Sequence, residues 1–268
     1  MGKQEALVPF GKRVKLCDYD ASYTGEVEKK GQVKELVKAN LARMAELQEL
    51  MFAEGKHALL IVLQAMDAGG KDSTIRRVME AFNPQGCHVT GFGAPTELER
   101  AHDFLWRIHH HTPPLGHVVI FNRSHYEDVL VVRVNELVPK EVWQKRYEHI
   151  NHFERLLADS GVTILKFYLH ISKDEQKERF QERLARKEKN WKFNPGDLKT
   201  RTQWDDYMEA FEDVFYECNH PWAPWYIVPA NRKWYRNLVV STAIVEAMEK
   251  LDMHYPPAPE GLEDIVIE

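Results

Sequence analysis

The sequence predicts an α/β fold in which helices flank a parallel sheet. Four short apolar runs have the length and composition of strands buried on both faces, and segments of helix length separate them. This alternation is typical of parallel strands covered by helices, with ligands bound at the carboxyl edge of the sheet. A chain of 268 residues, 44% of them hydrophobic, is long enough to bury such a sheet in one domain. The predicted strands are 58–63, 117–121, 162–169 and 225–228.

Three regions are expected along the chain. Residues 1–32 are polar and lack a sustained hydrophobic period, which predicts an N-terminal arm that is either disordered or wrapped around the domain. From Val33 to Met51 apolar residues recur at helical spacing, so a long helix opens a single domain over 33–255. Residues 256–268 begin with a proline-rich stretch and become acidic, which predicts a surface tail.

Composition and charge exclude several classes of protein. The three cysteines are scattered and form no CxxC pair, which argues against a disulfide framework or a structural zinc site. A formal net charge of -5 argues against a dedicated nucleic-acid binder. No apolar run approaches the length of a membrane span, and the N-terminus lacks the apolar segment of a signal peptide. These features predict a cytoplasmic protein with no nucleic-acid or membrane partner.

A phosphate-binding loop is predicted where the first strand ends. Two glycines and a lysine follow the strand directly, and an amphipathic segment of helical period comes next. Glycines allow backbone N–H groups to close around phosphate oxygens at a helix N-terminus, while Lys71 supplies a positive charge. Asp67 would then lie beside the phosphates. The predicted phosphate-binding residues of this loop are Ala68, Gly69, Gly70, Lys71, Asp72 and Ser73.

The loop departs from the pattern G-x-x-x-x-G-K-[ST] at two positions. Ala65 stands where the first glycine belongs, and Asp72 replaces the hydroxyl residue. The alternative is an ordinary glycine turn between a strand and a helix. If the loop does bind phosphate, a carboxylate such as Asp67 could take over part of the magnesium binding, because hard cations prefer oxygen ligands.

A second polar segment, Asn122–Asp128, follows the strand at 117–121. Strand ends beside a phosphate loop hold the metal ligands and charge-stabilising groups of phosphoryl-transfer enzymes. Arg123 can bind phosphate through two N–H groups, and Glu127 or Asp128 can bind magnesium. The alternative is a polar loop that starts a helix, with Asn122 or Ser124 as its cap.

A charged helix is predicted over 173–187, after the strand at 162–169. Arg179, Arg183 and Arg186 are spaced i, i+4 and i+7, so they project from one face, which suits a chain of phosphates. The alternative is a solvated helix with Glu–Arg pairs. The position of the helix favours the first interpretation, because kinases of this architecture close an arginine-bearing lid over the transferred phosphate.

Six segments in this order resemble polyphosphate kinase family 2, and the resemblance covers about residues 30–252. They include the phosphate loop and the polar segment after the strand at 117–121. Each is weak alone, but their combination is specific. The segments are the loop with Asp67, then 122–127, 178–184, 191–198, 204–207 and 223–237.

The resemblance implies a thymidylate-kinase-like P-loop kinase fold for 33–255, with a helical lid over about 173–218. It implies reversible transfer of the terminal phosphoryl group of inorganic polyphosphate to AMP, ADP or both, forming ADP and ATP. Mg²⁺ is the implied cofactor, with Mn²⁺ as an alternative, and family members often form dimers or tetramers. Family members often have an aspartate where this chain has Asn122, and this departure resembles the subgroup that accepts both AMP and ADP.

The resemblance also implies roles for individual residues. Asp67 and Glu127 would bind the metal. Arg123 and Arg183 would hold the transferring phosphate, with Lys71 completing the catalytic group. Arg179, Arg186 and Lys187 would guide the polyphosphate chain, and Asn122 and Arg123 would contact the nucleotide. Apart from the resemblance, Phe82 and Asn83 at the end of the phosphate-loop helix are candidates for contact with the base, and Arg133 could contact the acceptor phosphate.

Three other functions remain open from the residues alone. A phosphate loop and an arginine lid do not specify the donor, so the chain could be an ATP-dependent nucleoside or nucleotide kinase. It could also be a P-loop protein that binds nucleotide without catalysis. A protein that binds polyanions without turnover is the third alternative.

Overall fold

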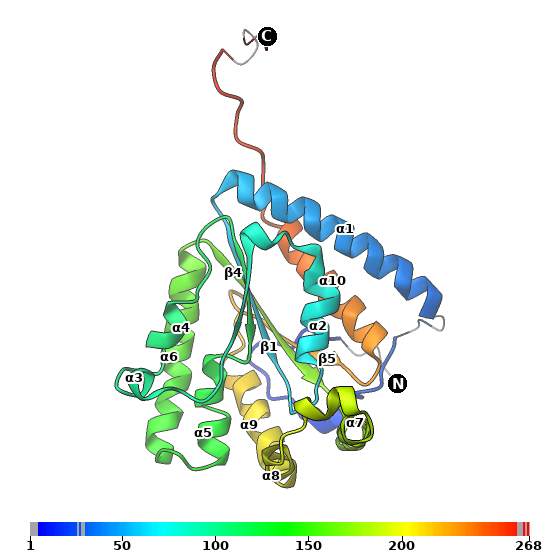
Figure 1. Cartoon of the computed structure of the whole chain (residues 1–268). Coiled ribbons are helices and arrows are strands. Elements are labelled where there is room, and N and C mark those ends of the chain that lie inside the picture. The colour runs from blue at the N-terminus through cyan, green and yellow to red at the C-terminus, as the bar shows by residue number, and fades with distance from the viewer. Residues whose placement is uncertain (1–4, 26, 28–29, 262–264, 266, 268) are drawn as a thin grey trace.

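The computed structural model describes residues 5–25, 27, 30–261, 265 and 267. A five-stranded, wholly parallel sheet lies at its centre, in the order β2-β3-β1-β4-β5 (Figure 1). This confirms the predicted fold class, and each of the four predicted strands is present. The strands are β1 (Ala58–Gln64), β2 (Cys87–Gly91), β3 (Val118–Asn122), β4 (Val162–His170) and β5 (Trp225–Pro229).

Strand β2 is absent from the predicted set. It lies at the edge of the sheet and pairs with β3 alone, from Cys87 opposite Val118 to Gly91 opposite Asn122. None of its five residues is fully buried. An edge strand of this kind needs no continuous apolar run, so hydrophobicity alone does not reveal it.

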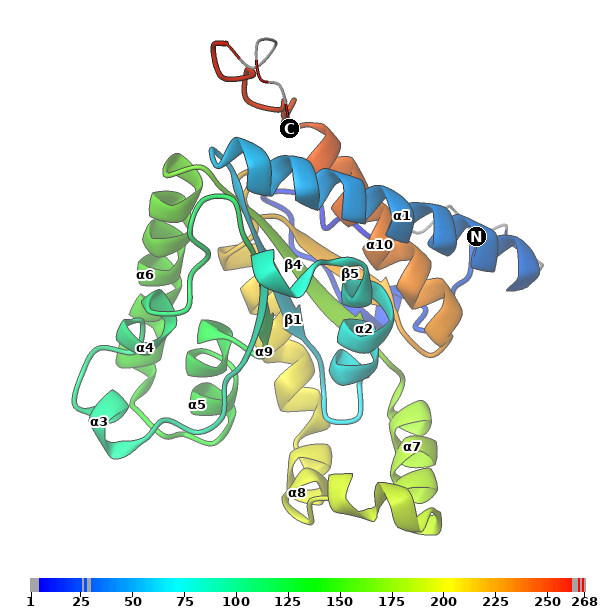
Figure 2. The same cartoon turned by 45° about the horizontal axis from the view of Figure 1, so that its top comes forward.

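Helices cover both faces of the sheet (Figures 1 and 2). One face carries α1, α2 and α10, and the other carries α5, α6 and α9. The first group comprises α1 (Lys30–Glu54), α2 (Lys71–Val78) and α10 (Lys233–Glu249). The second comprises α5 (Val131–Val134), α6 (Lys140–Asp159) and α9 (Trp204–Glu217), while the short α3 (Glu97–Arg100) and α4 (Trp106–His109) connect β2 to β3.

Two helices project beyond the carboxyl edge of the sheet, below β1 in Figure 2. They are α7 (Lys173–Ala185) and α8 (Gly196–Thr202), joined by a 3₁₀ helix at Lys187–Lys192. Ser172 caps α7 by accepting a hydrogen bond from the Glu175 N–H, as expected for a serine at this position. We call the segment from α7 to α8 the lid.

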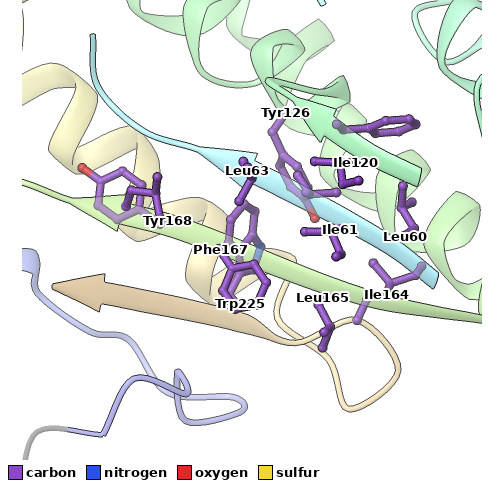
Figure 3. Packing of buried hydrophobic residues seen from close by; sticks show 14 of the residues in the cluster. Leu60, Ile61, Leu63, Ile120, Tyr126, Ile164, Leu165, Phe167, Tyr168 and Trp225 are labelled. Atoms are coloured by element: carbon purple, nitrogen blue, oxygen red, sulfur yellow. The ribbon is translucent and has the colours of Figure 1, made fainter. Parts of the chain in front are cut away.

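The core forms where the central strands pack against both helical layers (Figure 3). All seven residues of β1 are buried, as are eight of the nine residues of β4. The rings of Tyr126 and Trp225 pack edge to face with centroids 4.9 Å apart. Burial of each large apolar side chain contributes about 1.5–3 kcal/mol, so this cluster holds the strands and both helical layers together.

A polar network lies within this apolar core. Lys166 of β4 contacts Glu154 of α6 at 2.6 Å, and both side chains are fully buried. Lys166 also donates to the Tyr126 hydroxyl and to the Cys218 carbonyl, while His125 contacts Glu154 at 3.2 Å. Burial alone would raise the pKa of Glu154, but Lys166 and His125 outweigh it and lower that pKa. The network ties the segment after β3 to α6 and β4.

The described part of the N-terminal arm wraps around the domain. Leu7 bridges Tyr226 in an antiparallel arrangement, and the Val8 N–H donates to the Trp225 carbonyl at 2.9 Å. Val8 and Leu16 are buried. Of the two predicted alternatives, residues 5–25 therefore favour wrapping over disorder.

Parts of the predicted arm and tail, at 1–4, 26, 28–29, 262–264, 266 and 268, lie outside the described residues. Within the described chain no helix is long and apolar enough to cross a membrane.

Candidate active site

A cleft of about 800 Å³ opens at the carboxyl edge of the sheet. It is lined by the loop after β1, by residues at the ends of β2 and β3, and by the lid. Parallel α/β sheets bind their ligands at this edge.

The loop between β1 and α2 has the backbone of a phosphate-binding loop. Gly70 caps α2 with a φ of 108°, a conformation that glycine adopts without strain. Gly69 is needed for a different reason, since a Cβ there would overlap the Cβ of Ala65. Ala68 has a φ of 60°, which is uncommon for a residue with a side chain. Because α2 begins at Lys71, its first N–H groups have no acceptor within the helix and can bind an anion.

Two positive and two negative side chains interact at this loop. Arg123 and Lys71 are the positive ones, and Asp67 and Glu127 are the negative ones. Arg123 contacts Asp67 at 3.1 Å, and its own φ of 64° places it in the left-handed region, where a non-glycine residue is strained. Lys71 donates to the Ala65 carbonyl at 3.1 Å. Burial raises the pKa of Glu127, although the positive charges of Arg123 and Lys71 oppose this shift. Burial and the charge of Arg123 lower the pKa of Lys71.

Asp72 links the loop to the end of β3 and to the lid. The Asn122 amide donates to Asp72 Oδ1 at 3.0 Å, and Lys192 lies 3.6 Å from Asp72 Oδ2. Asp72 therefore has partners of its own at the cleft, where the hydroxyl of a standard phosphate loop would stand.

The lid brings Arg183 and Asp197 to the cleft. Arg183 lies 3.5 Å from Asp197 and donates to the Lys192 carbonyl at 3.0 Å. Burial and the negative charge of Asp67 raise the pKa of Asp197 to about 6, while Arg183 and Arg123 oppose the shift. The nearness of Asp197 to Asp67 places the lid close to the phosphate loop.

Most of the predicted phosphate-site residues line the cleft. Asp67 to Ser73, Asn122, Arg123, Arg179 and Arg183 all do so. Glu127 does not line it but interacts electrostatically with Lys71, Arg123 and Asp67. Arg179 is mostly buried, with its guanidinium bonded to the Ala68 and Ala230 carbonyls and to Glu175.

Other predicted residues lie elsewhere. Arg186 follows the end of α7 with extended backbone, where it pairs with Glu182 and Glu188, and neither it nor Lys187 lines the cleft. Arg133 is bonded to Asp213 and Glu209 of α9. None of these three cations lines the cleft, although Glu182 and Glu188, the partners of Arg186, do so.

Phe82 and Asn83 also lie away from the cleft. They follow α2, at the end of that helix opposite the phosphate loop, and the Gln48 side chain of α1 bonds both the N–H and the carbonyl of Asn83. Phe82 is buried in the core. The predicted base contact through this pair therefore has no support from its position.

Several residues of the cleft are absent from the predicted site. Asp197, Lys192 and Lys233 line it, and Arg236 lies beneath it. They stand in segments 191–198 and 223–237, whose resemblance to the family was the available signal. Phe92 and Gly93 line the cleft directly after β2, the strand that the sequence pattern does not reveal.

The donor set at the cleft fits a magnesium ion bound together with phosphate. Among the described residues no group of three or more His, Cys, Asp or Glu side chains converges as a ready-made metal site. Mg²⁺ commonly takes only one or two carboxylates from a protein and completes its shell with water and substrate phosphates. Asp67 and Glu127 are two carboxylates that interact with the same cations, Lys71 and Arg123.

Together, the glycine loop with its lysine, the carboxylates beside it and the arginine-bearing lid define a phosphotransferase of the P-loop kinase type. Residues 26–256 match the family described as Polyphosphate kinase 2 (PPK2). The match covers most of the chain, which therefore belongs to the polyphosphate kinase 2 family. The resemblance predicted from the sequence is confirmed.

Individual relatives agree with this assignment. The chain is 55% identical over 267 residues to an AMP/ADP-polyphosphate phosphotransferase of Meiothermus ruber, covering 99% of this chain and 100% of the relative. It is 44% identical over 258 residues to an ADP-polyphosphate phosphotransferase of Rhodopseudomonas palustris, covering 92% and 89%. Among solved structures, polyphosphate kinase 2 from Arthrobacter aurescens TC1 superposes with a TM-score of 0.91 at 42% identity, covering 97% of both chains.

Proposed function

We propose that this protein transfers the terminal phosphoryl group of inorganic polyphosphate to AMP and ADP, reversibly and with Mg²⁺. The observation that carries the proposal is the convergence of Lys71, Asp67 and Arg123 on one cleft, with Arg183 of the lid lining the same cleft. Family membership supplies the donor, and the name of the Meiothermus ruber relative supports both acceptors.

The protein residues contribute position and charge to this reaction. The N–H groups at the start of α2 and the Lys71 ammonium bind the donor phosphates. Arg123 and Arg183 hold the equatorial oxygens of the transferring group, where negative charge accumulates in the transition state. Lid closure excludes water, so that the phosphoryl group passes to the nucleotide and not to solvent.

Asp67 and Glu127 would hold the metal. Mg²⁺ held by these carboxylates would supply positive charge that neutralises the phosphates. Mn²⁺ has the same preference for oxygen ligands and is the alternative ion. Arg123 is paired with Asp67 at 3.1 Å, so binding of metal by Asp67 and of phosphate by Arg123 would replace this ion pair.

The acceptor nucleotide is assigned to the part of the cleft between β2 and β3. Asn122 and Arg123 line this part, together with Phe92 and Gly93. We propose that Arg179 positions the phosphate loop and does not guide the polyphosphate chain, because its donors already bind the Ala68 and Ala230 carbonyls.

Three further assignments remain predictions. The first is the division into an arm at 1–32, a kinase domain at 33–255 with a lid at about 173–218, and a tail at 256–268. The others are assembly into dimers or tetramers, which size-exclusion chromatography with light scattering measures, and a cytoplasmic location.

The identity of the phosphoryl donor distinguishes the proposed function from an ATP-dependent kinase and from a binding protein without activity. The pure protein is incubated with Mg²⁺ and AMP or ADP, with polyphosphate in one series and ATP in another, and products are separated by chromatography. We expect ADP and ATP to form from AMP only with polyphosphate. Transfer from ATP to AMP without polyphosphate would indicate an ordinary nucleotide kinase. No transfer from either donor would indicate a binding protein.

A further inference from the structure

Arg236 is a buried arginine directly beneath the phosphate loop. It comes from α10 and is 1% exposed. Its Nη1 donates to the Ser73 hydroxyl at 2.9 Å and to the Gly70 carbonyl at 3.3 Å, while Nε and Nη2 donate to Asn237 Oδ1. The fit is so close that a Cβ on Gly70 would overlap Nη1 of Arg236. The guanidinium and the loop therefore fix each other's position.

The described neighbours of Arg236 do not balance its positive charge. Its hydrogen-bond acceptors are a carbonyl, a hydroxyl and a side-chain amide, all of them neutral. Within the part of the chain that the structure describes, no carboxylate forms an ion pair with it. Its charged neighbour is Arg179, and burial together with that neighbour lowers the pKa of Arg236 to about 10. The group is still protonated at neutral pH, and a buried, unpaired charge of this kind destabilises a fold.

Three side chains donate hydrogen bonds to backbone carbonyls of the phosphate loop. The Gln176 amide donates to the Asp67 carbonyl at 2.8 Å, and Arg179 donates to the Ala68 carbonyl at 2.9 Å. Arg236 does the same for Gly70. The Gly70 carbonyl also accepts from the Thr74 N–H at 2.9 Å. Because the N–H of a trans peptide points opposite to its C=O, this bond and the bond from Arg236 together direct the Lys71 N–H away from Arg236.

We propose that Arg236 is a positioning residue for the phosphate loop, and that the phosphates of the bound donor supply the negative charge that it lacks. The inference rests on the proposed function for the identity of the donor. It implies that the empty protein bears an electrostatic cost, which is relieved when polyphosphate binds. Arg236 thus acts through the loop on phosphate affinity and alignment.

The test compares Arg236→Met, which removes the charge at similar volume, with Arg236→Lys, which keeps the charge but not the fork of donors. Arg77→Met is the matched control, because Arg77 is exposed on α2 and does not line the cleft. Thermal denaturation is measured with and without saturating tripolyphosphate, and KM and kcat are measured with polyphosphate and ADP.

For Arg236→Met we expect a melting temperature without ligand equal to or above that of the wild type, but a smaller shift with tripolyphosphate. We expect KM for polyphosphate to rise about tenfold or more, because the phosphates lose the attraction of a buried unit charge beneath the loop that binds them. Arg236→Lys should keep KM near the wild-type value and lower kcat. Arg77→Met should change neither the shift nor KM.

A lower melting temperature of Arg236→Met with an unchanged tripolyphosphate shift and KM would overturn the proposal, since it describes a purely structural residue. If Arg236→Met does not fold, an Arg236→Lys variant with wild-type kcat would overturn the positioning role. The wild-type donor assay is read separately. A wild type that is stabilised by tripolyphosphate through Arg236 but makes no product would keep this inference and overturn the proposed function.

Discussion

Glu127 and Asp128 are consecutive carboxylates with different partners. Glu127 interacts with Lys71 and Arg123 of the phosphate site. The Gln64 side-chain amide donates to Glu127 Oε1 at 3.0 Å when its oxygen accepts from Ser124. Asp128 instead accepts a hydrogen bond from Arg146 at 2.9 Å and lies 3.9 Å from Arg107. Only Glu127 therefore interacts with the cations of the cleft, a distinction that the sequence alone leaves open.

Glu127→Gln should raise the Mg²⁺ concentration needed for half-maximal transfer by about tenfold or more, the range seen when a group supporting a metal is lost. Asp128→Asn is the control. It should leave the Mg²⁺ requirement unchanged and lower the free energy of unfolding by about 1–3 kcal/mol, because Arg146 loses a charged partner. Magnesium titrations of the initial rate and urea denaturation measure the two effects. Equal Mg²⁺ requirements in both variants would remove Glu127 from the metal site.

Two lid arginines should differ in their effect on catalysis. Arg183 lines the cleft, whereas Arg186 does not line it and is paired with Glu182 and Glu188. Arg183→Ala should lower kcat by about a hundredfold or more, as when one transition-state donor is lost. Arg186→Ala should keep kcat within about fivefold, as expected for an exposed ion pair. Steady-state kinetics with polyphosphate and ADP measures both, and losses of equal size would contradict the placement of the lid.

The raised pKa of Asp197 should make the stability of the metal-free protein depend on pH. Its pKa in the folded protein is raised to about 6, while the unfolded chain releases this proton near pH 4. Between these values the native state binds more protons, so the contribution of Asp197 to stability falls as pH rises from about 4 to 6 and is then constant. Asp197→Asn should lack this fall. Thermal denaturation in EDTA across this range measures the difference, and parallel profiles of the two proteins would refute the assignment.

The buried pair of Lys166 and Glu154 should dominate the stability of the core network. Lys166→Met leaves Glu154 without its charged partner and should cost about 3–5 kcal/mol. Replacing both residues by methionine should cost less than the sum of the two single changes. Arg43→Met is the control, since its pairs with Glu46 and Glu249 are exposed, and it should cost about 1 kcal/mol or less. Urea denaturation measures each change, and additive costs would show that the two groups do not interact.

The fold could be predicted largely because its central strands are buried on both faces. Such strands read as continuous apolar runs, and β1 with its seven buried residues is the clearest example. Strand β2 could not be predicted in this way, because edge position and exposure leave it no apolar run. The cleft residues Phe92 and Gly93 were missed for the same reason.

Site residues could be predicted where they stand in one short sequence motif, and not where tertiary packing brings them to the site. Lys71 follows two glycines at the end of a strand, so its role could be expected from sequence. Arg186 fits the helical spacing of Arg183, but α7 ends one residue before it, so the two side chains are not on one helical face. Arg236 lies far along the chain from the loop that it contacts, and only the packing of α10 against α2 brings them together.

The most direct test of the account is the initial rate of ATP formation from polyphosphate and ADP, with Mg²⁺, in the wild type and in Lys71→Ala. Lys56→Ala is the matched control, because the Lys56 side chain is 75% exposed. We predict that Lys71→Ala loses about a hundredfold or more in rate, the effect of removing one charge-stabilising group, while its unfolding transition stays cooperative. A folded Lys71→Ala variant that forms ATP at the wild-type rate would contradict the assignment of the cleft as the site of phosphoryl transfer.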